Sequence, residues 1–216
     1  MIRNYTQDEL EDISEKLLQQ FDSERLGIPK PIDVYKVVEN CLCVPYEWQY
    51  ISPDQSILGL TIMKSGYYWI WPKPYFEKNM KPEKVFFKEG TILIERSLTE
   101  RAERGRENFT VIHEVFHNIL HKDFFAENGD VKCAYESLRE HPDHRFGLEN
   151  LSELDICEFQ ANYCATCFLM PKRPFTDRVK KLSVNTDDNA LLSEMAKEFS
   201  VTKKAVQLRM QMLGLQ

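Results

Sequence analysis

Hydrophobic positions near the start of the chain recur every three or four residues. This period over residues 7–21 predicts an amphipathic helix with one face buried. Thr6 and Glu9 precede it at the spacing of a capping box, in which each side chain bonds the main chain at the other position. Pro31 is a helix-start signal and predicts a second, short helix over residues 32–39.

The hydrophobic period shortens to two from residue 42. The alternating run 42–50 contains Pro45, which predicts a strand at a sheet edge because proline cannot donate to the ladder. Two glycine-containing triplets then lie between apolar runs, and we expect each to close a β-hairpin of an antiparallel sheet. The expected hairpins join 57–63 to 67–71 through 64–66, and 85–87 to 91–94 through 88–90.

The aromatic run 67–71 suits a half-buried strand, so we assign it to the core rather than to a ligand-stacking surface. If an edge of the sheet lies near a reactive centre, an extended peptide can add to that edge as a further strand.

The second half of the chain is dominated by two apolar helical segments. A charged connector over 95–107 leads into the first, 109–121, whose apolar side chains cover much of its circumference and predict a buried helix. The acidic stretch 123–158 is expected to be a long surface excursion. The second apolar helix is predicted over 153–170; Pro171 ends it, and we expect Pro174 to prevent an immediate restart. Two short helices, 189–199 and 202–213, complete the chain.

The composition is that of a folded domain. Hydrophobic residues make up 43% and charged residues 29% of the 216 positions, which excludes a disordered or fibrous chain. The net charge of −6 disfavours nucleic-acid binding through a generally basic surface. No apolar run approaches the roughly 20 residues that a membrane span needs, and the first residues lack a signal-peptide core. We therefore expect a cytoplasmic protein without membrane contact, whose six cysteines are reduced thiols.

Residues 113–117 spell His-Glu-Val-Phe-His within the strongest helical pattern. Four residues of α-helix advance the chain by about 6 Å and turn it by about 40° net, so His113 and His117 project from one face and can share one ion. Neutral imidazoles suit Zn²⁺, and a catalytic zinc site leaves one position for water. Glu114 would take the proton of that water as general base and pass it to a departing amine. Two hydrogen-bonded core histidines are the alternative interpretation.

A third metal ligand must come from elsewhere in the chain. The HExxHxxGxxH arrangement is excluded, because Leu120 stands where its glycine should be and Asp123 where its third histidine should be. We choose Glu158 in the second apolar helix, where the small Ala161 permits close helix packing and Asn162 can accept the free ring N–H of a histidine. A surface glutamate is the alternative. The competing ligands are Glu153, Asp155, His141 and His144. His121 has rotated away from His113 and is expected to be a supporting or surface residue.

These residues resemble a known family. The segment 109–121, with its HExxH, and the segment 158–171, Glu-Phe-Gln-Ala-Asn-Tyr-Cys-Ala-Thr-Cys-Phe-Leu-Met-Pro, are together similar to the paired signature of the ImmA/IrrE zinc metallopeptidases. The resemblance implies that His113, His117 and Glu158 hold Zn²⁺ and that Glu114 is the general base. Phe116 departs from the family pattern, which has glycine before the second histidine, and Cys164 and Phe168 alter the second helix.

The resemblance also implies a cellular role. Members of this kind are encoded by prophages and other mobile elements, and act as anti-repressors that cleave a helix-turn-helix repressor; other members act in stress responses. We therefore expect an intracellular zinc endopeptidase that cleaves such a repressor. The alternative is a metal-binding regulatory module that binds a repressor or DNA without cutting.

The expected architecture is an α+β, zincin-like metallopeptidase domain over residues 1–175. It comprises N-terminal helices, an antiparallel sheet, the HExxH helix and the helix that carries Glu158. A helical tail resembling a helix-turn-helix follows over 176–216. Its positive and negative charges nearly balance, which favours packing or repressor docking over DNA binding.

Two smaller groups of residues remain to be considered. Cys164 and Cys167 form a CxxC without a second pair, so we assign both to the core rather than to a metal. The group that would stabilise the reaction intermediate beside zinc has four candidates: Tyr135, His141, His144 and Tyr163.

Overall fold

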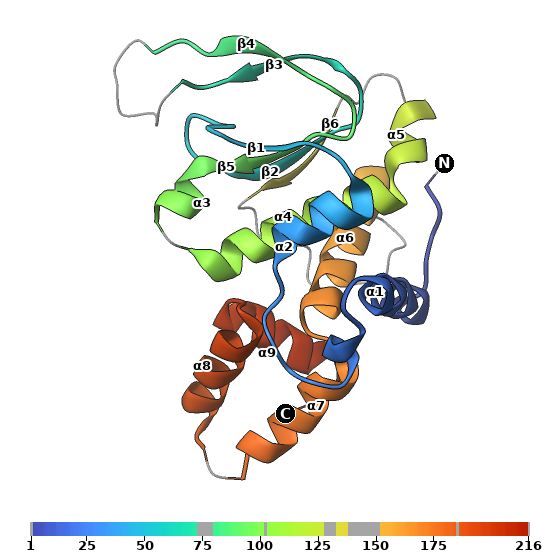
Figure 1. Ribbon diagram of the computed structural model, residues 1–216, viewed down its shortest axis with the longest axis vertical. Coiled ribbons are helices and arrows are strands. Elements are labelled where there is room, and N and C mark those ends of the chain that lie inside the picture. The colour runs from blue at the N-terminus through green and yellow to red at the C-terminus, as the bar shows by residue number, and fades with distance from the viewer. Residues whose placement is uncertain are drawn as a thin grey trace.

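A computed structural model gives the fold of this chain. It describes residues 2–72, 80–101, 103–127, 133–137 (main chain), 152–184 and 186–215. The protein is α+β, as predicted, with the strands gathered at one end and the C-terminal helices at the other (Figure 1). No helix among these residues is long and apolar enough to cross a membrane.

The main sheet has four strands in the order β1-β5-β2-β6. Its members are β1 Tyr46–Gln49, β2 Ile57–Ile62, β5 Ile92–Glu95 and β6 Cys133–Ser137. The run that contains Pro45 is an edge strand, as predicted, but β1 pairs with β5 in parallel, with Tyr46 opposite Ile92. The other pairs in this sheet are antiparallel.

The two predicted hairpins are wrong, because the glycine triplets form a bend in a strand pair and not two chain reversals. Strand β3 (Gly66–Ile70) pairs with β4 (Glu83–Phe87), while β2 pairs with β5. The chain therefore forms one long two-stranded ribbon that bends where the two triplets oppose each other. Ser65 Oγ accepts from the main-chain N–H of Glu89, and Gly90 lies at φ +85°, which glycine adopts without strain. A local turn pattern cannot distinguish a reversal from a bend that its partner strand follows.

The ribbon end is less buried than its aromatic composition predicts. In β3 the side chains alternate, so that Ile70 is buried while Tyr67 and Trp69 are 67% and 57% exposed. The assignment of the whole aromatic run to the core is therefore wrong for these two residues. Only one face of this two-stranded segment packs on the core.

The predicted helices are all present, and each begins within five residues of its expected start. They are α1 Gln7–Asp22, α2 Val34–Val37, α3 Arg96–Glu100, α4 Arg104–Leu120, α5 Lys122–Glu127, α6 Glu153–Leu169, α7 Lys172–Leu182, α8 Asp188–Phe199 and α9 Lys203–Met212. A 3₁₀ turn, Ser23–Leu26, follows α1, and a π turn, Val38–Leu42, follows α2. Thr6 and Glu9 form the predicted capping box.

Three segments contain elements that the sequence did not predict. The charged connector holds α3, and α4 begins within it. The acidic excursion contributes α5 and the edge strand β6. Pro174 does not delay a helix, because α7 begins at Lys172 and a proline in the first turn removes no hydrogen bond.

Helix α4 is the centre of the molecule. It lies against the four-stranded sheet on one side and packs on α6 on the other (Figure 1). Val111, Val115 and Phe116 are fully buried there and join the main apolar cluster with Ala161 and Cys164 of α6. This burial holds the two apolar helices together along the length that carries their polar residues.

The C-terminal helices pack on the same cluster. Phe175 of α7, Met195 and Phe199 of α8, and Val206 of α9 are all buried in it. A Cβ at Gly105, in the first turn of α4, would lie 2.6 Å from the main-chain carbon of Val201, so the turn between α8 and α9 lies directly on α4. A division of the chain between residues 175 and 176 stays a prediction.

Candidate metal centre

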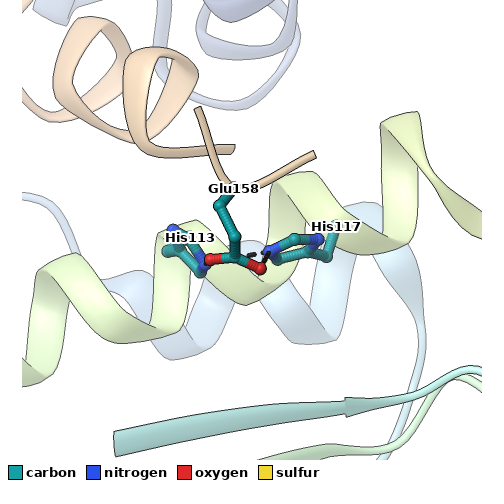
Figure 2. A group of neighbouring side chains, drawn as sticks. All are labelled: His113, His117 and Glu158. Carbon is teal, nitrogen blue, oxygen red and sulfur yellow. Dashed lines mark hydrogen bonds and ion pairs between the residues drawn. The ribbon is translucent and has the colours of Figure 1, made fainter. Parts of the chain in front are cut away.

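Two histidines of α4 and one glutamate of α6 converge on one point. His113 Nε2 and His117 Nε2 are 2.9 Å apart, and the two carboxylate oxygens of Glu158 lie 3.3 Å and 3.2 Å from them (Figure 2). One ligand atom from each residue lies within 4.8 Å of the others, so the group could hold a metal ion. Glu158 reaches across from α6 onto the face of α4 where both rings project, as the four-residue spacing predicts.

Neighbouring groups keep these side chains in the forms that bind metal. Burial lowers the pKa of His117, because the imidazolium form loses its hydration, and the effect outweighs the opposing charge of Glu158. Burial alone would raise the pKa of Glu158, but His117 and His113 outweigh it and lower that pKa. The group therefore contains a neutral imidazole and a carboxylate, which are the ligand forms. The Glu158 side chain is 30% exposed, while both histidines are buried.

Asn162 orients the first histidine. Its Oδ1 lies 2.9 Å from His113 Nδ1, as predicted. Since a carbonyl oxygen only accepts, the Nδ1 of His113 carries the proton and Nε2 presents its lone pair toward His117 and Glu158. Ala161, one residue earlier, is fully buried in the packing of α6.

Glu114 lies on the sheet side of α4 and is not part of the three-residue group. The Thr61 hydroxyl of β2 lies 2.5 Å from Glu114 Oε2, to which it donates, and 3.2 Å from the Glu114 main-chain oxygen. A Cβ at Gly59 would lie 2.6 Å from Glu114 Oε1, so only glycine leaves room for this carboxyl group. The assignment of Glu114 as general base stays a prediction.

Comparison with known proteins agrees with the signature of the two helices. The profile of the IrrE N-terminal-like domain matches residues 91–211, more than half of the chain. The chain belongs to the IrrE N-terminal-like family. The matched segment contains α4 and α6, which carry His113, His117 and Glu158, and most of the C-terminal helices.

A solved structure shares the fold of this IrrE-like chain. It is a Mycobacterium tuberculosis transcriptional regulator, superimposed with a TM-score of 0.51 at 15% identity over 96% of this chain. The IrrE-like chain spans 47% of the length of that regulator, and at this identity the likeness concerns the fold alone. No curated protein matches the sequence.

Two departures from the family signature pack against each other. Phe116 of α4 and Phe168 of α6 are fully buried, and their rings meet edge to face with centroids 6.0 Å apart. The bulky residue before His117 therefore fills space between the helices, and the His113 and His117 rings still converge on Glu158.

The competing ligand candidates lie elsewhere or outside the described residues. Glu153 Oε1 accepts from the main-chain N–H of Ile2, and Asp155 caps the start of α6 with Ser152. His141 and His144 fall outside the described residues. So does the side chain of Tyr135, while Tyr163 is buried beside Phe159, where burial raises its pKa. The stabilising group for an intermediate stays open.

The cysteines behave as core residues. The side chains described, those of Cys41, Cys43, Cys157, Cys164 and Cys167, are free thiols. Cys164 and Cys167 are buried, and burial raises the pKa of Cys164 to about 12, so its thiol stays protonated at neutral pH. This agrees with the assignment of the CxxC to the core.

Two further residues support the site, and only one of them was predicted. His121, expected as a supporting or surface residue, is a supporting one: it is fully buried, its Nδ1 lies 3.0 Å from His117 Nδ1, and burial lowers its pKa to about 3. Its spacing of four residues from His117 is typical of such a contact on one helix face. Thr61 carried no signal, because a threonine in a strand is ordinary.

Proposed function

We propose that this protein is a zinc-dependent endopeptidase in which His113, His117 and Glu158 hold the metal and Glu114 is the general base. The observation that carries the proposal is the convergence of two ring nitrogens and a carboxylate within 4.8 Å, between two helices that share a buried apolar cluster. A metal ion between these electron-pair donors would relieve their mutual repulsion.

The donor set fits zinc better than calcium or magnesium. Two imidazoles and one carboxylate are a usual protein ligand set for catalytic Zn²⁺, whereas calcium and magnesium prefer oxygen atoms. When bound, Zn²⁺ would supply a Lewis acid that lowers the pKa of water and polarises a peptide carbonyl. The exposed fraction of Glu158 leaves an approach to the group from solvent.

The chain's own residues would manage the proton. Glu114 would take a proton from the attacking water and deliver it to the amine that leaves the cut bond. Thr61 would hold Oε2 of Glu114 in place, and Gly59 would keep the space that the carboxyl group occupies. A zincin-like layout, with the substrate added as a strand along the edge strand β6, is part of this proposal.

We further propose a helix-turn-helix transcriptional repressor in the cytoplasm as the substrate. Membership of the IrrE N-terminal-like family supports this, since the resemblance of the two helices implies repressor cleavage. The likeness in fold to a regulator agrees with a role in transcriptional control.

Replacement of Glu114 by Gln tests the reaction. The amide keeps the shape of the side chain but cannot take the proton, so we expect peptide-bond cleavage to fall about 10²- to 10⁴-fold while bound zinc is unchanged. The measurement compares new protein N-termini in cells that express the wild type or Glu114→Gln, with metal content determined by elemental analysis.

Metal removal provides the matching control. A chelator should stop the formation of the same new N-termini in lysate, and added Zn²⁺ should restore their formation. If Glu114→Gln yields the same products as the wild type, hydrolysis at this centre is contradicted. Relief of repression by Glu114→Gln without any cleavage would instead support the metal-binding regulatory module.

A further inference from the structure

We propose that His121 and Gln160 are positioning residues that keep the ring proton of His117 on Nδ1, and so leave Nε2 with the lone pair that a metal ion needs. The proposal rests on the proposed metal centre. It concerns residues outside the ligand set, which act on the metal only through His117.

The main-chain oxygen of Arg3 can only accept a hydrogen bond. The main-chain oxygen of Arg3 lies 2.8 Å from Gln160 Nε2, which donates to it. This contact determines the orientation of the Gln160 amide, because its nitrogen must face the carbonyl. The Oε1 of Gln160 then faces His121 Nε2 at 3.0 Å.

The orientation of Gln160 determines which ring nitrogen carries the proton, first in His121 and then in His117. The amide oxygen accepts, so His121 Nε2 carries a proton, and in a neutral ring its Nδ1 must accept. His117 Nδ1, 3.0 Å away, is therefore the donor. The remaining nitrogen of His117, Nε2, presents its lone pair toward Glu158 Oε1, 3.2 Å away.

Burial makes the hydrogen-bonded relay from Gln160 through His121 to His117 hard for water to replace. His121 and His117 are fully buried and Gln160 is 1% exposed, so water cannot replace a lost partner without entering the packed helices. Both hydrogen-bond partners of the His121 ring are neutral groups, an amide oxygen and an imidazole nitrogen, which suits a neutral ring. A reversed relay would require the carbonyl of Arg3 to donate, which it cannot do.

The test uses two disruptive variants, a conservative variant and a matched control. His121→Leu and Gln160→Leu break the relay, whereas His121→Asn keeps an oxygen near the position of Nδ1. Cys164→Ala is the control: it is a buried position of the same helix, four residues after Gln160, whose thiol donates to the main-chain oxygen of Leu10 in α1 and takes no part in the relay. Zinc affinity is measured by competition with a chelating dye, and the His117 tautomer by imidazole ¹⁵N NMR of the metal-free protein.

We expect His121→Leu and Gln160→Leu to weaken zinc binding about 10- to 100-fold, the usual effect of losing a group that orients a ligand. The proton of His117 should sit on Nδ1 in the wild type and move wholly or partly to Nε2 in both variants. His121→Asn should lose less affinity, and Cys164→Ala should change neither quantity. A merely structural role would alter thermal unfolding without moving the tautomer.

Wild-type zinc affinity and an Nδ1 proton in both Leu variants would overturn the proposal, as would an Nε2 proton on His117 in the wild type. If His121→Leu fails to fold, Gln160→Leu and the wild-type tautomer decide it. Failure of the proposed function is seen separately: a wild type that binds no zinc, or binds it without cutting, leaves the NMR measurement of the tautomer intact.

Discussion

Ring orientation decides what the two histidines of α4 can do. Helical spacing brings His113 and His117 to one face, but a ring can present either nitrogen, and only contacts from α6 and from His121 select Nε2. Asn162 acts on one ring directly, and Gln160 acts on the other through His121. Single side chains two positions apart on α6 thus determine which ring nitrogens the HExxH helix presents toward Glu158.

Thr61 offers a test at the same scale. Thr61→Val removes the hydroxyl that donates to Glu114 and should lower the free energy of unfolding by about 1–3 kcal/mol, because a buried carboxyl group loses a hydrogen bond. The measurement is urea unfolding followed by circular dichroism.

Thr110→Val is the matched control for this substitution. Thr110 is equally buried, but its Oγ1 has no hydrogen-bond partner among the described residues. Removal of that hydroxyl should leave stability unchanged or raise it by about 1 kcal/mol. Equal losses in the two variants would show that the bond from Thr61 to Glu114 contributes nothing.

Helix α4 packs against several other elements at once. One side meets the sheet, the other meets α6, and its first turn meets the connection between α8 and α9. Asn108 donates to the main-chain oxygen of Ser200 at 2.9 Å, which supports that last contact. The helix therefore joins the metal-binding group to the C-terminal helices as well as to the sheet.

Gly105→Ala should destabilise the protein, although a change from glycine to alanine usually stabilises a helix. In an open helix the change from glycine to alanine stabilises by about 1 kcal/mol. Here the new Cβ would meet main-chain atoms of Val201 and Thr202 at 2.6–3.0 Å, so we expect a loss of about 1–3 kcal/mol in thermal or urea unfolding.

Gly27→Ala serves as the control for Gly105. A Cβ at Gly27 would meet nothing closer than 3.8 Å, and its φ of −120° suits any residue. This variant should stay close to the wild type. A stabilising Gly105→Ala would mean that the α8–α9 turn does not rest on α4.

At the scale of the molecule, two buried arginines connect distant segments. Arg25 donates to the main-chain oxygens of Phe168 and Leu169 at the end of α6. Arg209 of α9 donates to both carboxylate oxygens of Glu11 in α1 and to the main-chain oxygen of Met170. The first helix, the helix that carries Glu158 and the last helix are thereby held as one unit.

Arg209→Met should lower the free energy of unfolding by about 3–5 kcal/mol, because the carboxylate of Glu11 is left in a nearly dry site. The double variant Arg209→Met, Glu11→Leu should recover part of this loss. Arg96→Met, which breaks an exposed ion pair with Glu100, is the control and should cost under about 1 kcal/mol. Equal effects in urea unfolding at the two arginines would contradict the role of Arg209.

The sequence by itself determined the local features of this protein. Helical spacing placed His113 and His117 on one face, Thr6 and Glu9 capped α1, and Pro45 indicated an edge strand, because each depends on residues only a few positions apart. Glu158 and Asn162 were chosen from the residue types and spacing of the second apolar helix, and the family resemblance of that helix implies the same ligand.

Only the tertiary structure decided what depends on distant partners. The glycine triplets became a bend because β2 pairs with β5 and β3 with β4, and β6 completed a sheet from within an acidic segment. Burial of His121, the contact of Thr61 with Glu114 and the pairing of Arg209 with Glu11 join residues far apart in the chain. Such contacts follow from how the helices and the sheet pack together, and spacing along the sequence carries no record of that packing.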